Sequence, residues 1–146
     1  MNNTNSLAGL DRQPPLKRII SGGQTGADMG GLKAAKILNI PTGGYAALNF
    51  RTELGLNQEL GTVYGLTDTR VFNYLHRTRM NVAESDGTVL FGDMSSPGSK
   101  QTIQICKKFE RPYFVVRNAE RVSTVLEWII FHHIQILIEP ALPIDP

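Results

Sequence analysis

The sequence contains a single cysteine, Cys106, which excludes an intrachain disulfide and any metal site built from several thiolates. An excess of one charge is also missing, because 15 Lys and Arg residues stand against 13 Asp and Glu residues, for a net charge of +2. This balance gives no reason to expect nucleic acid or a membrane surface as a partner. A chain without disulfides suits a reducing compartment, so we expect a cytoplasmic protein.

Long apolar runs are missing as well. The most apolar stretch, residues 128–138, contains two histidines and a glutamine and is too short to cross a bilayer. Residues 1–15 are polar, rich in asparagine and without the apolar region of a signal peptide. We therefore expect a flexible extension over residues 1–15, followed by one domain over residues 16–146, a length that suits a single core.

Strand-like and helix-like segments alternate along the rest of the chain. Apolar periodicity places Val71 and Val82 on one helical face and Leu126, Ile129 and Ile130 on another. Such alternation predicts an α/β fold with a parallel sheet and helices on both faces. Residues 42–66 read as a brief strand and a long loop. The predicted strands are 16–21, 44–47, 88–91, 113–116 and 134–138, and the predicted helices are 27–39, 68–85, 100–109 and 120–133.

The segment SGGQTGAD, residues 21–28, follows the first predicted strand and leads into the first predicted helix. Glycines let a ligand approach the backbone closely, and the first turn of a helix attracts anions. The glycine spacing matches neither a Walker A loop nor the full dinucleotide-binding motif, and Thr25 and Asp28 also fit a capping box that needs no ligand. A phosphate loop and a purely structural turn both remain open, and the position after the first strand favours the phosphate loop.

Two arginines follow in the second predicted helix. Arg77 and Arg79 point about 200° apart on a helix, so we expect only one of them to face a ligand, where its guanidinium would clamp a phosphate or carboxylate. A merely solvated helix face is an equally open alternative. Asn81 and Ser85, near the end of the same helix, fit local hydrogen bonds equally well.

A second glycine-containing loop follows the strand at residues 88–91. Gly98, Ser99 and Thr102 at its end open the next helix, either as a second anion pocket or as simple caps. The histidines lack metal-ligand spacing, and we recognise no nucleophile with an orienting base and acid. The sequence therefore predicts no catalytic residue and no metal site.

Several motifs in order resemble the so-called molybdenum carrier proteins of the SLOG group, whose members have Rossmann-like folds. They are SGGQTGADMGGLKAA, PTGGY, YLHRTRMNVAESDGTVLF, GSKQT and RPYFVV, within residues 17–128. The resemblance implies a Rossmann-like three-layer α/β/α fold with a mainly parallel sheet of about five strands. It also implies a phosphate-bearing ligand, either a nucleotide or the molybdenum cofactor. Carried over by position, Gly22, Gly23, Gln24, Thr25 and Gly26 form the anion loop with Asp28 beside it, Arg77, Asn81, Ser85, Asp86 and Gly87 belong to the second motif, and Gly98, Ser99 and Thr102 line the opposite wall.

Two departures from the family pattern bear on function. The final segment, IQILIEPALPIDP, replaces the family's Asn-Val-Ala-Gly-Pro-Arg-like segment, and SSPGSKQTIQI lacks the glutamate that hydrolases of the wider group use. The preferred hypothesis is a carrier or sensor that binds a phosphate-bearing small molecule. One alternative is a nucleotide N-glycosidic hydrolase with Asp28 or Glu84 as its acid. Another is a regulatory module that acts as a homo-oligomer through WIIFHHIQILI, and we expect a homo-oligomer in any case.

Overall fold

The structure of the chain is a computed structural model that describes residues 16–24, 26–117 and 122–138. Within these residues a five-stranded, fully parallel sheet has the order β2-β1-β9-β7-β8. The extension predicted over residues 1–15 lies outside the described part. The strands are β1 (Arg18–Ile20), β2 (Thr42–Gly43), β7 (Gly87–Phe91), β8 (Tyr113–Val116) and β9 (Ile136–Ile138).

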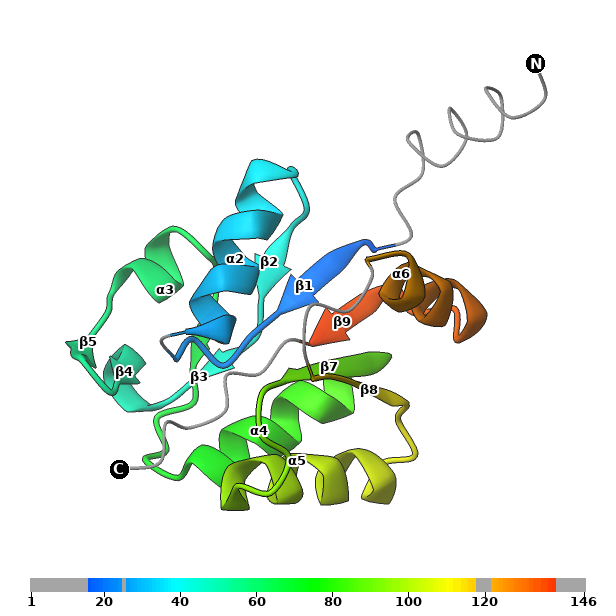
Figure 1. Cartoon of the computed structure of the whole chain (residues 1–146). Coiled ribbons are helices and arrows are strands. Elements are labelled where there is room, and N and C mark those ends of the chain that lie inside the picture. Colours follow the sequence, from blue (N-terminus) through cyan, green and yellow to red (C-terminus); the bar gives the residue numbers. More distant parts are fainter. Residues whose placement is uncertain (1–15, 25, 118–121, 139–146) are drawn as a thin grey trace.

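Helices cover both faces of this sheet, as Figure 1 shows. On one face lie α2 (Ala27–Ile37) and α6 (Val122–Phe131), and on the other lie α4 (Tyr74–Glu84) and α5 (Pro97–Lys108). The predicted Rossmann-like α/β/α architecture is confirmed.

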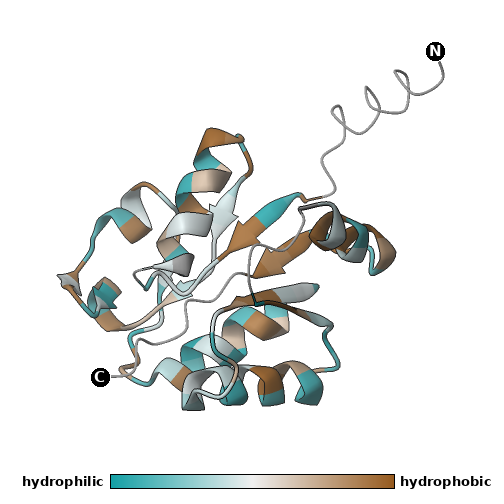
Figure 2. Ribbon diagram, viewed as in Figure 1, coloured by the Kyte–Doolittle hydropathy of each residue, from teal (hydrophilic) through white to brown (hydrophobic). Residues whose placement is uncertain are grey.

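Alternation along the strands builds the two halves of the core. Ile19 packs with Ala35 of α2 and Ile129 of α6, whereas the next residue, Ile20, packs with Cys106 of α5 and with α4. Successive side chains of a strand point to opposite faces, so each short central strand contributes to both layers. The brown colour of β9 and α6 in Figure 2 marks this apolar centre.

The predicted long loop has structure of its own. Two-residue pairings join β3 to β6 in parallel and β4 to β5 as an antiparallel hairpin. A third apolar cluster, which includes Leu32, Leu60 and Leu66, packs this insert against α2. Its elements are β3 (Tyr45–Ala46), the 3-10 helix η1 (Leu48–Phe50), β4 (Arg51–Thr52), β5 (Gly55–Leu56), α3 (Glu59–Thr62) and β6 (Thr67–Asp68).

Two predicted helical faces need correction. The second helix begins at Tyr74 rather than at residue 68, because Asn73 caps it and the preceding residues pair as β6; Val71 is therefore 36% exposed. In α6, Ile129 is buried but Ile130 is 47% exposed. The face of the helix that packs against the sheet is therefore narrower than the predicted apolar face.

The strand order has a simple relation to the Rossmann fold. Numbered along the chain, the five strands of the sheet lie in the order 2-1-5-3-4. If the last strand is counted as the first, the order becomes 3-2-1-4-5, which is that of a doubly wound Rossmann sheet. The chain thus has the Rossmann arrangement with β9, its last strand, in the place of the first.

Candidate functional site

The candidate site lies at the edge where all five strands of the sheet end. Because the strands are parallel, the loops after β1 and β7 open at this edge, and α2, α4 and α5 begin there (Figure 1). One strand, β9, separates β1 from β7, so their ends lie about 10 Å apart, which is twice the strand spacing. Ligands of open α/β sheets bind at this edge.

The loop after β1 turns at two glycines with positive φ, Gly23 at 79° and Gly26 at 80°. Its inner side is held by the protein itself. The Gly23 N–H donates to the Ser21 hydroxyl at 3.0 Å, and the Gln24 N–H donates to the Asp28 carboxylate at 2.8 Å. These two backbone N–H groups therefore bond within the protein and stabilise the conformation of the loop. Thr25, the remaining residue of the predicted anion loop, lies outside the described part of the chain.

Gly26 is the N-cap residue of α2 and makes no side-chain cap. Its φ of 80° and ψ of −126° form a conformation that residues with a side chain rarely adopt. In contrast, α4 and α5 begin with Asn73 and Ser96, whose side chains accept first-turn N–H groups. Gly26 itself thus supplies no side-chain acceptor for the first-turn amides of α2, whereas the cap residues of the other two helices do.

Arg77 lies directly behind the loop. It is 4% exposed, and its Nη1 donates to the Gly22 carbonyl oxygen at 3.2 Å. A Cβ on Gly22 would lie 2.5 Å from this nitrogen, so glycine is required for the approach. Burial lowers the pKa of Arg77, and the Asp28 carboxylate opposes that shift. A guanidinium stays protonated, so a buried cation supports the loop.

Two buried polar atoms near the loop have no hydrogen-bond partner within the described residues. They are Nε of Arg77 and Oε1 of Gln24. The other amide atom of Gln24, Nε2, donates to the Arg51 carbonyl at 3.1 Å and ties the loop to the β4–β5 hairpin. Buried polar groups in native proteins are nearly always paired, so such atoms indicate a bound water or ligand.

The two carboxylates considered for hydrolysis lie in different places. Asp28 is fully buried and accepts the Gln24 N–H. Glu84 is the last residue of α4, at the opposite edge of the sheet, where it accepts the Tyr45 hydroxyl. The structure does not bring them together around one ligand.

The loop after β7 uses its hydroxyls internally. Ser96 Oγ accepts the Ser99 N–H at 3.2 Å, and Ser99 Oγ donates to the Asp93 carbonyl at 2.8 Å. Thr102 Oγ1 donates to the Gly98 carbonyl at 3.0 Å. Gly98, Ser99 and Thr102 thus lie at the predicted edge of the sheet, but the hydroxyls of Ser99 and Thr102 both donate to nearby backbone carbonyls, and Ser96 is the cap of α5.

Asn81 lies one helical turn beyond Arg77 and clamps the insert. Its Oδ1 accepts the Tyr45 N–H at 2.8 Å, and its Nδ2 donates to the Tyr45 carbonyl at 3.1 Å. Next to Tyr45, Gly44 has a φ of 119°, and a Cβ there would lie 2.4 Å from the Ser21 carbonyl. Asn81 therefore supports the first loop indirectly, through the position of β3.

Ser85, Asp86 and Gly87 lie at the opposite edge of the sheet, where β7 begins. Asp86 Oδ2 accepts the N–H groups of Gln135 and Ile136, which orders the start of β9. The structure thus separates these three residues from the loop with which the sequence grouped them, because they precede a strand whereas the loop follows one.

Other residues at the site were missed by the sequence interpretation. Arg51 lies with its guanidinium carbon 5.1 Å from the centre of the Phe72 ring, and that of Arg77 lies 5.3 Å from the Tyr74 ring. The only signal in the sequence is an aromatic pair just before a helix, which does not reveal such long-range contacts.

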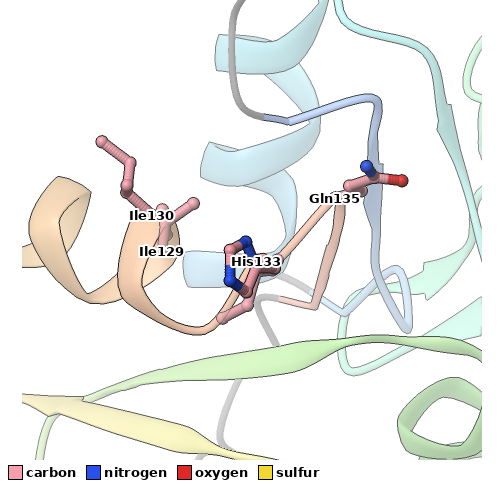
Figure 3. Close-up of a pocket in the computed structure, with 5 residues that line it drawn as sticks. Ile129, Ile130, His133 and Gln135 are labelled. Carbon is pink, nitrogen blue, oxygen red and sulfur yellow. The ribbon is translucent and has the colours of Figure 1, made fainter.

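A separate surface pocket of about 210 Å³ lies beside the start of β9 and the end of α6 (Figure 3). Its lining is mainly apolar, with Ile129, Ile130 and Ile134, and His133 and Gln135 complete it. It belongs to the edge of the sheet opposite the glycine loop.

Within the described ranges, no group of three or more His, Cys, Asp or Glu side chains is placed to hold a metal ion. In the same ranges, no helix has both the length and the apolar character needed to span a bilayer.

Comparison with known proteins identifies the family. Residues 19–138 match the model described as the circularly permutated YpsA SLOG family. The chain belongs to this family. The rearranged strand order, with β9 in the place of the first Rossmann strand, agrees with the permutation in the family description. The glycine loop consequently follows β1, the neighbour of that strand.

Two solved structures are similar to varying degrees. A crystal structure titled "Putative molybdenum carrier protein", from Syntrophus aciditrophicus SB, has 30% sequence identity and a TM-score of 0.79, over 90% of this chain and 85% of that chain. (E)-4-hydroxy-3-methyl-but-2-enyl diphosphate reductase has 12% identity and a TM-score of 0.39, over 97% of this chain and 58% of that chain, which is too low to inform on function. No curated protein matches the chain significantly.

Proposed function

We propose that the chain is a cytoplasmic carrier or sensor that binds a phosphate-bearing small molecule, a nucleotide or the molybdenum cofactor, at residues 22–26. The observation that carries this proposal is the start of α2: the helix has a glycine, with no side chain to cap it, at its N-cap position, and it follows a glycine loop supported by the buried Arg77. Membership of the SLOG family and the similarity to a protein titled a molybdenum carrier support a binding role.

The attraction for phosphate comes from the backbone rather than from net charge. Asp28 lies in the first turn of α2 and acts electrostatically on Arg77, so these two buried charges offset each other. What remains is the positive end of the α2 dipole and the first-turn N–H groups, which together bind anions. Arg77 holds the Gly22 carbonyl and thereby fixes the shape of the loop.

The residues fit the phosphate part of either ligand. The two unpartnered buried atoms, Gln24 Oε1 and Arg77 Nε, lie beside the loop, as a binding site requires. The described residues offer no side-chain cluster for molybdenum itself. In a carrier, residues 22–26 would therefore hold the cofactor by its phosphate, and the organic part of the cofactor would keep the metal.

Titration calorimetry of the full chain with AMP, GMP, NAD and the molybdenum cofactor tests the proposal. We expect at least one of these to bind with micromolar affinity. Gly26→Ala should weaken that ligand at least tenfold, because a Cβ at φ 80° forces the loop to rearrange. Gly30→Ala is the matched control: it lies in α2 with nothing within 4 Å of the new Cβ and should leave affinity unchanged. The proposal fails if none of the four ligands binds.

A homo-oligomer is a separate part of the proposal. In α6, Ile130 is 47% exposed and Phe131 is 77% exposed. Neighbouring large apolar side chains that are exposed to solvent are typical of an interface. Burial of this face against a second copy would remove them from water. Light scattering measures the mass directly, and a monomer at all concentrations would contradict this part.

A further inference from the structure

We propose that the ligand carries a planar heteroaromatic ring and that Phe72 and Tyr74 bind the face of this ring beside the glycine loop. The inference rests on the proposed function, because the ring is attached to the phosphate group bound at residues 22–26. It adds a second recognition element that selects the class of ligand.

A chain of contacts leads from the loop to Phe72. Gln24 Nε2 donates to the Arg51 carbonyl at 3.1 Å, which joins the loop to β4. The guanidinium of Arg51 then lies 5.1 Å from the centre of the Phe72 ring. Arg51 therefore links the loop, which it contacts through its carbonyl, with Phe72, which it contacts through its guanidinium.

A second chain of contacts returns from Tyr74 to the same loop. The guanidinium of Arg77 lies 5.3 Å from the centre of the Tyr74 ring, and its Nη1 donates to the Gly22 carbonyl at 3.2 Å. Phe72 and Tyr74 flank Asn73, the cap of α4. The two chains of contacts therefore start at the same loop and end at neighbouring residues. The two aromatic rings therefore lie at the rim of the glycine loop, at the carboxyl edge of the sheet.

These rings are open to solvent even though they are apolar. Phe72 is 60% exposed and Tyr74 is 39% exposed. Exposed aromatic rings with a guanidinium against them are the surface on which heteroaromatic rings stack, and such stacking tolerates many ring types because each presents a π-face. The buried acceptor Gln24 Oε1, which has no partner in the described residues, adds a place for an N–H or O–H donor of the ligand.

The shared chemistry is thus a phosphate joined to a planar nitrogen heterocycle. A purine nucleotide and the pterin of a molybdenum cofactor both have it. The probes separate these sources: AMP and GMP carry purines, a pterin phosphate carries a pterin, and ribose 5-phosphate carries the phosphate without a ring.

Titration calorimetry of these probes against the full chain is the test. We expect at least one ring-bearing probe to bind ten times more tightly than ribose 5-phosphate. Phe72→Ala should abolish most of that advantage, a loss of about tenfold, since stacking on an aromatic side chain contributes this much or more. The affinity for ribose 5-phosphate should not change, and Phe72→Trp should retain the tighter binding. Ile37→Ala, which removes an 80% exposed apolar side chain at the end of α2, is the matched control and should have no effect.

Each of the following results of these titrations would contradict the inference. If ribose 5-phosphate binds as tightly as the ring-bearing probes, or if Phe72→Ala binds them as the parent chain does, the ring proposal is wrong and the phosphate site stands. If no probe binds, both proposals fail. If Phe72→Ala changes the mass in light scattering, the aromatic pair belongs to an interface between copies, and the ring proposal is overturned.

Discussion

The turns after β1 and β7 occupy equivalent places in the fold but end differently. Both follow a buried parallel strand, contain glycines and lead into a helix at the same edge of the sheet. After β7, Ser96 caps the helix α5 and Ser99 bonds back to Asp93. After β1, Gly26 precedes α2 with no side-chain cap, and the buried Arg77 supports the loop from behind.

This difference teaches that a glycine-rich strand-to-helix turn is not by itself a phosphate loop. The Ser96 hydroxyl accepts a first-turn N–H that an anion would otherwise accept, so the turn after β7 is closed by its own side chain. In the turn after β1 the cap position is a glycine, which has no hydroxyl, and two buried polar atoms nearby lack a partner among the described residues. The predictions that follow test this contrast, in order of decreasing effect.

The largest effect is expected for Arg77→Met. The substitution removes a buried guanidinium that holds the Gly22 carbonyl and that the buried Asp28 carboxylate attracts. We expect the free energy of unfolding to fall by about 3 kcal/mol or more, since the loss of one member of a buried charge pair has such a cost. Denaturant titration measures it. The matched control is Arg79→Met, an exposed residue on the same helix, which should change stability by less than about 0.5 kcal/mol. Equal effects would show that Arg77 does not support the loop.

Gly26→Ser comes next in size. Serine is the residue type that caps α5, but at a φ of 80° its side chain strains the backbone. We therefore expect a loss of about 1–2 kcal/mol rather than the gain that a new cap would give. Thermal unfolding measures the sign. Gly30→Ala, at an unstrained helical position, should instead stabilise by about 1 kcal/mol. A more stable Gly26→Ser chain would mean that both turns can be closed in the same way.

Ser96→Ala should have a smaller effect. It removes the acceptor of the Ser99 N–H and should cost about 1 kcal/mol of stability, as the loss of a helix cap does. Because this turn is not the proposed site, the affinity for any bound nucleotide should remain that of the parent chain. If calorimetry shows that the variant binds the nucleotide more than twofold less tightly, the contrast between the two turns is contradicted.

The smallest effect concerns pH at the turn after β7. Hydrogen bonds from the Ser95 hydroxyl and N–H lower the pKa of Asp93. A lowered carboxyl pKa stabilises the folded state above the ordinary value, and that contribution is lost as the pH falls through the folded-state pKa. NMR titration should show Asp93 titrating below the usual aspartate range. Ser95→Ala, which keeps the N–H bond, should raise its pKa part of the way back. An unchanged midpoint in the variant would show that the hydroxyl does not contribute.

Much of the sheet was predictable from sequence because its strands are short apolar runs next to periodic helices. β7, β8 and α2 lie within about three residues of their predicted bounds. The insert was not predictable, because two-residue strands such as β3 and β6 exist only through pairing with distant partners. For the same reason the predicted start of α4, residue 68, was wrong, and the helix begins at Tyr74.

The candidate site divides in a similar way. The divergence of Arg77 and Arg79 follows from helix geometry alone, and the structure confirms it, with the first buried and the second exposed. The opposite edge assigned to Asp86 could not be foreseen from motif order. Chain proximity says nothing about which end of a strand a residue occupies until the direction of that strand in the sheet is known. The contact of Arg51 with Phe72 is equally non-local.

The most direct test is an amide NMR titration of the full chain with the tightest-binding nucleotide. We predict that the largest shifts fall on the N–H groups of residues 22–28, with those of residues 96–102 changing much less. Dominant shifts at residues 96–102, or shifts spread without focus over the sheet, would contradict the account, since the helix end left open by Gly26 would then not be where the phosphate binds.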